Sequence, residues 1–269
     1  MRRLSLSRAW EDTRTIVARE GRLLASVALA LIVLPQTVMA VVGVPMGPQA
    51  TLLSTAVYVL VLLIGLSAQI AVNRLAIGPS TTVGMAISRG FTRLLPVFTT
   101  FFLLIMALFV VLIVIAMVLG AAGLMPPIGT AQSPPPLIIL LMLLLITLSF
   151  AVVQLSIPIA AAESGGPFRL FSRSWQLGRG EYWRLLAFAI VMFIGIAVLA
   201  LAARFIFGSL VIILLGRPSP GTVSALVLGL IAGVVQAAFT VISAVMLARI
   251  YVELADRGGS GSGVPISGT

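Results

Sequence analysis

Six long apolar segments, separated by shorter polar ones, set the pattern of this sequence. They cover residues 23–42, 52–72, 96–119, 137–161, 183–203 and 223–247. A helix of about 20 residues crosses the hydrocarbon core of a bilayer, which is about 30 Å thick, so each segment predicts one transmembrane helix. A further apolar segment, residues 205–216, is too short to cross. It predicts either an extension of the fifth span or a segment that lies at the interface.

Polar segments precede the first, third and fifth spans, and they predict three amphipathic helices on the membrane surface. The first covers residues 4–20, the second lies between Gly78 and the third span, and the third begins at Pro167 within the stretch 163–186. In this central stretch Phe168, Phe171 and Trp175 share one helix face, with arginines at similar spacing on the neighbouring face. Such a helix is typical of a segment that lies flat among lipid headgroups. The residues that we expect at the lipid interface are Arg169, Arg173, Trp175, Arg179, Trp183 and Arg184.

The distribution of arginine predicts the orientation of the chain. All 17 basic residues are arginines, and 15 of them lie in the N-terminus, in the segments after spans two and four, and in the C-terminus. The two on the opposite side are Arg204 and Arg217, and all seven acidic residues lie on the arginine-rich side. Because positive loops stay in the cytoplasm, we expect both termini to be cytoplasmic, in a bacterial inner membrane.

The composition agrees with a membrane protein. The chain has 269 residues, 60% of them hydrophobic and 9% charged, and its mean hydropathy is +1.21, whereas soluble domains carry about 25% charged residues. A net charge of +10 beside apolar spans favours anionic lipid headgroups as partners rather than nucleic acid. A further partner would be another membrane protein or a second copy of the chain. There is no cysteine and no histidine, which excludes disulfides, thiolate chemistry and histidine–metal sites.

Three marks with a common period predict a threefold internal repeat of surface helix, span and span. A Ser-Arg phrase begins each copy, an Arg-Leu-Leu phrase precedes each first span, and one glutamine lies in each second span. The Ser-Arg phrases are Ser7-Arg8-Ala9-Trp10, Ser88-Arg89-Gly90-Phe91 and Ser172-Arg173-Ser174-Trp175. Their spacing places the copies at residues 1–77, 78–162 and 163–257, and these form one membrane domain, 1–257, followed by a disordered tail, 258–269.

The glutamines inside the spans, Gln69, Gln154 and Gln236, leave two interpretations open. They either form hydrogen bonds between helices, typically contributing about 0.6 to 2 kcal/mol, or they line a polar path through the membrane. A stripe of small residues in the sixth span, Ala225, Gly229, Gly233 and Ala237, permits close helix contact. This contact would be either within the chain or with a second copy.

The sequence contains none of the motifs that we would expect of an enzyme. No metalloprotease motif, phosphate-binding loop, nucleophile elbow or pair of carboxylates within a span is present. We therefore predict no catalytic residues, no metal site and no cofactor. Glu163 precedes the central surface helix, and we expect it to interact with the positive N-terminus of that helix rather than to be a proton-linked site.

Several of these residues carry a resemblance to a known family. They are Pro158-Ile-Ala-Ala-Ala-Glu163, Gly166-Pro167, Arg173-Ser174-Trp175-Gln-Leu-Gly-Arg-Gly180, Trp183-Arg184 and Tyr251-Val-Glu-Leu-Ala-Asp-Arg257. The chain resembles the bacterial membrane family known as the glycerophosphoryl diester phosphodiesterase membrane domain, together with YciC-like proteins of unknown function. In some members a catalytic domain follows, but its histidine and metal ligands have no counterpart here, so the resemblance implies a membrane unit without enzymatic activity.

These observations predict an all-α, polytopic membrane protein with six transmembrane helices and three cytoplasmic surface helices. We expect a non-catalytic module that binds anionic lipid or a membrane partner through its Arg/Trp cytoplasmic face. The alternative is a transporter or channel for a small solute or a lipid, with a polar path near the three glutamines.

Overall fold

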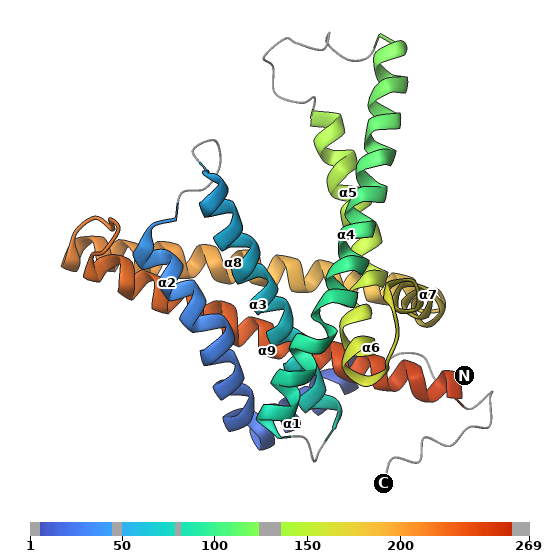
Figure 1. Cartoon of the computed structure of the whole chain (residues 1–269), viewed down its shortest axis with the longest axis horizontal. Helices are drawn as coiled ribbons and strands as arrows, with labels where there is room; N and C mark the ends of the chain where they lie inside the picture. Colours follow the sequence, from blue (N-terminus) through green and yellow to red (C-terminus); the bar gives the residue numbers. More distant parts are fainter. Residues whose placement is uncertain (1–5, 45–49, 79–81, 124–135, 260–269) are drawn as a thin grey trace.

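Helices form almost all of the part of the chain that this computed structural model describes, which comprises residues 6–44, 50–78, 82–123 and 136–259. No strand occurs in these residues. The helices, shown in Figure 1, are α1 (Leu6–Ala28), the π-helical turn η1 (Leu29–Val33), α2 (Leu34–Val42), α3 (Leu52–Ile77), α4 (Val83–Ala121), α5 (Pro136–Val153), α6 (Ser156–Ala162), α7 (Pro167–Gly178), α8 (Tyr182–Leu215) and α9 (Val223–Gly259).

Six helical runs among the described residues are long and apolar enough to cross a membrane. They are Ser7–Val42, Leu52–Ile77, Val83–Ala121, Ile139–Ala162, Tyr182–Leu215 and Val223–Asp256. Five runs contain a predicted span in full, and the fourth overlaps the span predicted over 137–161, which the structure divides into α5 and α6 at residues 154–155. The predicted all-α polytopic fold is therefore confirmed.

Two of the three predicted surface helices are not separate elements. Residues 6–20 continue without interruption into the first span as α1, and residues 83–95 continue into the third span as α4. Pro96 lies inside α4 without ending it. With 39 residues, α4 is about 58 Å long, nearly twice the hydrocarbon thickness, so its first turns extend beyond the apolar layer or the helix is tilted. The third predicted surface helix, α7, is a separate element.

The structure also settles the end of the fifth span. Residues 205–215 continue α8 without a break, so they extend the span instead of forming an interfacial segment. At the C-terminus α9 includes residues 258 and 259, which we expected in the disordered tail, and the rest of the tail lies outside the described residues. Arg2, Arg3 and most of the predicted outer loop before α5 also lie outside the described residues.

The first span widens into a π-helical turn directly before Pro35. Proline has no N–H, and its ring would clash with the carbonyl group four residues earlier in a regular α-helix. The wider turn relieves this conflict, and the Thr37 hydroxyl donates to the Val33 carbonyl oxygen at 2.8 Å. The helix therefore continues as α2 past the proline.

The core lies around α9, which contacts α1, η1, α2, α3, α6, α7 and α8. One apolar cluster joins the C-terminal part of α9, including Ile250 and Leu254, to residues of α4, α6, α7 and α8. A second cluster joins Ala244 and Val245 of α9 to α1, η1 and α3. Burial of these side chains, at about 25 cal/mol per Å² of apolar area, holds the arginine-bearing ends of the helices together.

The stripe of small residues in α9 packs within the chain, against the first span. A Cβ atom at Gly229 would lie 2.5 Å from the Ala40 Cβ, and one at Gly233 would lie 3.1 Å from the Val33 Cα. The contact at Gly229 leaves no room for a side chain, and a Cβ atom at Gly233 would force η1 to move by a few tenths of an ångström. By contrast, the outer parts of α4, α5 and α8 are largely exposed, and Figure 1 shows the α4–α5 and α8–α9 pairs leaving the region of α6 and α7 in different directions.

Candidate functional site

The central surface helix, α7, packs on the bundle through a stripe of small and apolar residues. Gly165 and Gly166 precede it, and Pro167 occupies its first turn, where a missing N–H is tolerated. The buried residues Leu170, Ser174 and Gly178 follow at intervals of four. A Cβ atom at Gly178 would lie 3.3 Å from side-chain atoms of Leu185 and Val152, so the glycine allows α7 to contact both α8 and the end of α5.

The aromatic face of α7 is exposed. Phe168, Phe171 and Trp175 are 79%, 41% and 52% exposed, and Trp183, at the start of α8, is 76% exposed. In a soluble protein four such side chains would form a costly apolar patch. At a bilayer surface, aromatic rings occupy the headgroup level, and the exposed face of α7 has the composition of a helix that lies in this layer.

The four arginines of the central stretch fall into two groups. Arg173 Nε contacts Glu163 Oε1 at 3.4 Å, and Arg184 Nη1 contacts Glu181 Oε2 at 3.0 Å, so both guanidinium groups already have acidic partners. Arg169 and Arg179 are exposed, and no ion pair joins them to the described part of the chain. These two guanidinium groups are therefore free to bind an external anion.

Glu163, which we expected to interact with the N-terminus of α7, forms a polar junction between three helices. The Tyr251 hydroxyl of α9 donates to Glu163 Oε1 at 3.0 Å, and Arg173 of α7 contacts the same oxygen. Arg89 Nη2 of α4 donates to the backbone oxygen of Glu163 at 3.1 Å. This junction fixes the start of α7 against α4 and α9, and so it positions the exposed face of α7.

Sequence reasoning did not predict this junction, although its residues carried recognisable signals. Arg89 and Arg173 occupy the same place in two Ser-Arg phrases, and Tyr251 belongs to the C-terminal motif that carried the family resemblance. Arg89, Arg173 and Tyr251 all contact Glu163. Only the folded chain brings Glu163 to Tyr251, which is 88 residues away in sequence.

The structure places the three span glutamines in different environments. Gln154 is buried, and its Nε2 donates to the Ala151 carbonyl oxygen at 3.1 Å and to the Leu185 carbonyl oxygen at 3.4 Å, which ties the break between α5 and α6 to α8. Gln69 is half-buried in α3, and Gln236 is exposed on α9. Gln154 thus connects helices, whereas Gln236 faces the surroundings of the bundle.

Equivalent positions of the Ser-Arg phrases share their burial. Ala9, Gly90 and Ser174, the third residue of each phrase, are buried, while the aromatic residue that follows each, Trp10, Phe91 or Trp175, is about half exposed. At Gly90 the reason is direct, since a Cβ atom there would lie 2.5 Å from the Ser67 carbonyl oxygen. Each phrase therefore places a small residue against the bundle and an aromatic ring outside it.

The six apolar helices and their exposed outer surfaces define the class: this is a multi-pass α-helical membrane protein. Within the described residues no group of three or more acidic, histidine or cysteine side chains could hold a metal ion. The chain belongs to the family described as a domain of unknown function, DUF7847, whose model matches residues 4–254, from α1 to near the end of α9. It matches no curated protein and no solved structure.

Proposed function

We propose that this protein is a non-catalytic membrane module that binds anionic lipid headgroups through α7 and the start of α8. One observation carries the proposal. α7 faces the bundle with Leu170, Ser174 and Gly178 and faces outward with three aromatic side chains and the unpaired Arg169. Arg179, directly after the helix, adds a second unpaired guanidinium group.

The expected strength follows from the number of free cations. A basic side chain near an anionic membrane surface contributes about 1 kcal/mol. Arg169 and Arg179 together supply about 2 kcal/mol, which is about a 30-fold enrichment of an anionic over a neutral headgroup. Arg173 and Arg184 contribute less, because their acidic partners, 3.4 and 3.0 Å away, offset their charge.

In this proposal the arginine-rich ends of the spans lie in the cytoplasm, in a bacterial inner membrane, with both chain termini on that side. The distribution of 17 arginines along the sequence supports this orientation. The threefold repeat is part of the same proposal, and the shared burial of Ala9, Gly90 and Ser174 supports it. A transport role finds less support, because Gln154 is bonded between helices and Gln236 is exposed.

The three tryptophans of the chain provide the experiment. A variant with Trp175 as its single tryptophan (Trp10→Phe and Trp183→Phe) is reconstituted as the full chain in phosphatidylcholine vesicles. Brominated phosphatidylglycerol or brominated phosphatidylcholine, which quenches tryptophan on contact, is included at equal mole fraction. We expect stronger quenching by the anionic lipid, and we expect Arg169→Gln with Arg179→Gln to remove the difference.

The control is Arg217→Gln, an exposed arginine in the turn between α8 and α9, which should leave the quenching of Trp175 unchanged. Equal quenching of Trp175 by both lipids would refute lipid selectivity at α7. In that case an associated protein that co-purifies with the parental chain, but not with the Arg169 and Arg179 variant, would assign the face to a membrane partner.

A further inference from the structure

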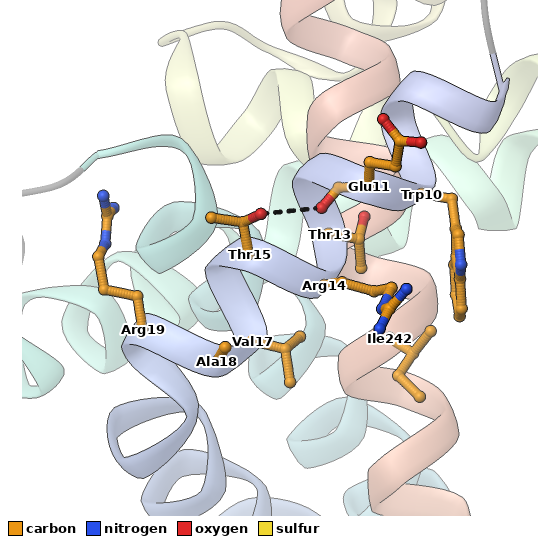
Figure 2. A pocket seen from close by; sticks show the side chains of 9 residues that line it. All are labelled: Trp10, Glu11, Thr13, Arg14, Thr15, Val17, Ala18, Arg19 and Ile242. Carbon is orange, nitrogen blue, oxygen red and sulfur yellow. Dashed lines mark hydrogen bonds between the residues drawn. The ribbon is translucent and has the colours of Figure 1, made fainter.

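A second surface feature lies along the first span, where α1 packs on α9. The N-terminal part of α1 borders an open hollow of about 930 Å³, which Trp10, Arg14 and Val17 line together with Ile242 of α9. Figure 2 shows the Arg14 side chain beside Ile242 and Trp10, while the Glu11 carboxylate points away from this group. Arg19 borders the far end of the hollow and pairs with Glu20 at 3.0 Å.

An apolar groove of about 340 Å³ continues this hollow between α1 and α9. Gly21 and Leu29 line one wall, and Val234 lines the other. Val17 and Ile242 border both spaces, so the groove opens directly into the hollow. The π-helical turn contributes Leu29 and Val33 to the wall, which connects this unusual turn, of a type often found at functional sites, with the groove.

The dimensions fit one leaflet of a bilayer. From Gly21 to Val33 the groove follows the first span for about 18 Å, close to the roughly 15 Å of hydrocarbon in one leaflet. Arg14 lies about 10 Å further toward the N-terminus, at the depth of the headgroups. Trp10, Arg14, Val17 and Gly21 follow one another at intervals of three or four residues, so a single face of α1 leads from the cation into the groove.

The charge of the hollow agrees with a phosphate group. Arg14 is exposed, and no ion pair joins it to the described residues. Arginine binds phosphate oxygens through two parallel N–H groups. Glu11 would repel an anion at the opposite edge, which places the phosphate on the side of Arg14 and Trp10.

We propose that the hollow and the groove together bind one phospholipid molecule. The Arg14 guanidinium donates to the phosphate, the Trp10 ring flanks the headgroup, and an acyl chain lies between α1 and α9 beside Gly21 and Leu29. This site is separate from the α7 face, because Leu170 of α7 belongs to the apolar cluster that includes Ile250 and Leu254 of α9, whereas the groove is lined by α9 residues between Val234 and Ile242. It holds a single lipid in a fixed place, whereas the α7 face enriches headgroups at the surface.

The test measures lipid retained by the full chain in mild detergent by native mass spectrometry after addition of long-chain phosphatidylglycerol. We expect one lipid to remain bound at activation energies that remove the others. Arg14→Gln should weaken this retention about fivefold, the effect of one cation at an anionic surface. Gly21→Leu should abolish it by filling the groove, because a Cβ atom at Gly21 meets no other atom within 4 Å and the helix itself is undisturbed.

Matched controls make the outcome decisive. Arg22→Gln removes an exposed arginine outside the hollow, and Gly65→Leu adds the same side chain to α3, again with open space around the Cβ atom. Both should retain the lipid, as should the Arg169 and Arg179 variant of α7, so that this proposal and the proposed function fail independently. Retention unchanged by both Arg14→Gln and Gly21→Leu would overturn the site.

A second measurement separates a lipid from a free anion. In a variant whose single tryptophan is Trp10, long-chain phosphatidylglycerol should shift the fluorescence, while inorganic phosphate at the same concentration should not. A shift with inorganic phosphate alone, unaffected by Gly21→Leu, would show a simple anion site and would overturn the assignment to a phospholipid.

Discussion

The hydrogen bond between Tyr251 and Glu163 allows a quantitative test of the junction that positions α7. Tyr251 is only 6% exposed, and its hydroxyl donates to Glu163 Oε1 at 3.0 Å. Tyr251→Phe removes the hydroxyl and keeps the ring, so no large cavity forms. A hydrogen bond to a charged group contributes about 1.5 to 3 kcal/mol. Water can partly replace the hydroxyl, because the Glu163 side chain is 28% exposed.

We therefore expect Tyr251→Phe to lower the free energy of unfolding by about 1 to 2 kcal/mol, roughly a tenfold change in the unfolding equilibrium. Reversible unfolding of the purified chain in mixed micelles with increasing dodecyl sulfate, followed by circular dichroism, measures this change. Combined with Glu163→Gln in a double-mutant cycle, the two substitutions should show a coupling energy of about 1 kcal/mol.

The control is Tyr58→Phe, whose hydroxyl donates to the Val44 carbonyl oxygen at 3.1 Å, far from the junction in sequence. It should be additive with Glu163→Gln to within about 0.5 kcal/mol. Additivity between Tyr251→Phe and Glu163→Gln as well would refute the view that the junction holds α7 against α9.

Two further predictions concern packing and orientation. Gly229→Leu should destabilise the chain by about 1 to 3 kcal/mol through overpacking, because its Cβ atom would lie 2.5 Å from the Cβ atom of Ala40. The control, Gly65→Leu, adds a side chain with no neighbour within 4 Å of its Cβ atom and should be neutral. The same unfolding assay compares the two variants, and equal effects would contradict the close contact. Since the chain has no cysteine, Arg179→Cys and Arg217→Cys introduce single thiols, and a membrane-impermeant maleimide should label them from opposite sides of the membrane. Labelling of both from one side would contradict the proposed orientation.

The sequence was sufficient to predict the spans, but not where each helix begins. Long apolar segments must bury or cover their surface, so hydropathy alone identified six helices that the structure contains. The polar residues before Leu23 and Pro96 continue into the spans through α1 and α4, and neither Gly90 nor Pro96 ends α4. Where Gly165 and Gly166 precede Pro167, a new helix begins as predicted.

Part of the candidate site could likewise be predicted from the sequence, and part of it depends on how the helices pack. The spacing of Phe168, Phe171 and Trp175 predicted that they share a face, and the structure leaves that face exposed. The pairing of Glu163 with Tyr251 depends on how α7 and α9 pack, and the phospholipid groove needs both α1 and α9. No local pattern contains this information, because each contact joins segments far apart in sequence.

The central place of α9 also has a consequence for the order of assembly. This helix contacts α1, α2, α3, α6, α7 and α8, all of which precede it in the chain. During synthesis the first span therefore enters the membrane before α9, the helix with which α1, η1 and α2 make most of their contacts. A nascent chain arrested before Val223 should expose the unpaired surface of α1 to quality-control proteases, and release of the arrest should make it resistant within the time that one helix needs to dock.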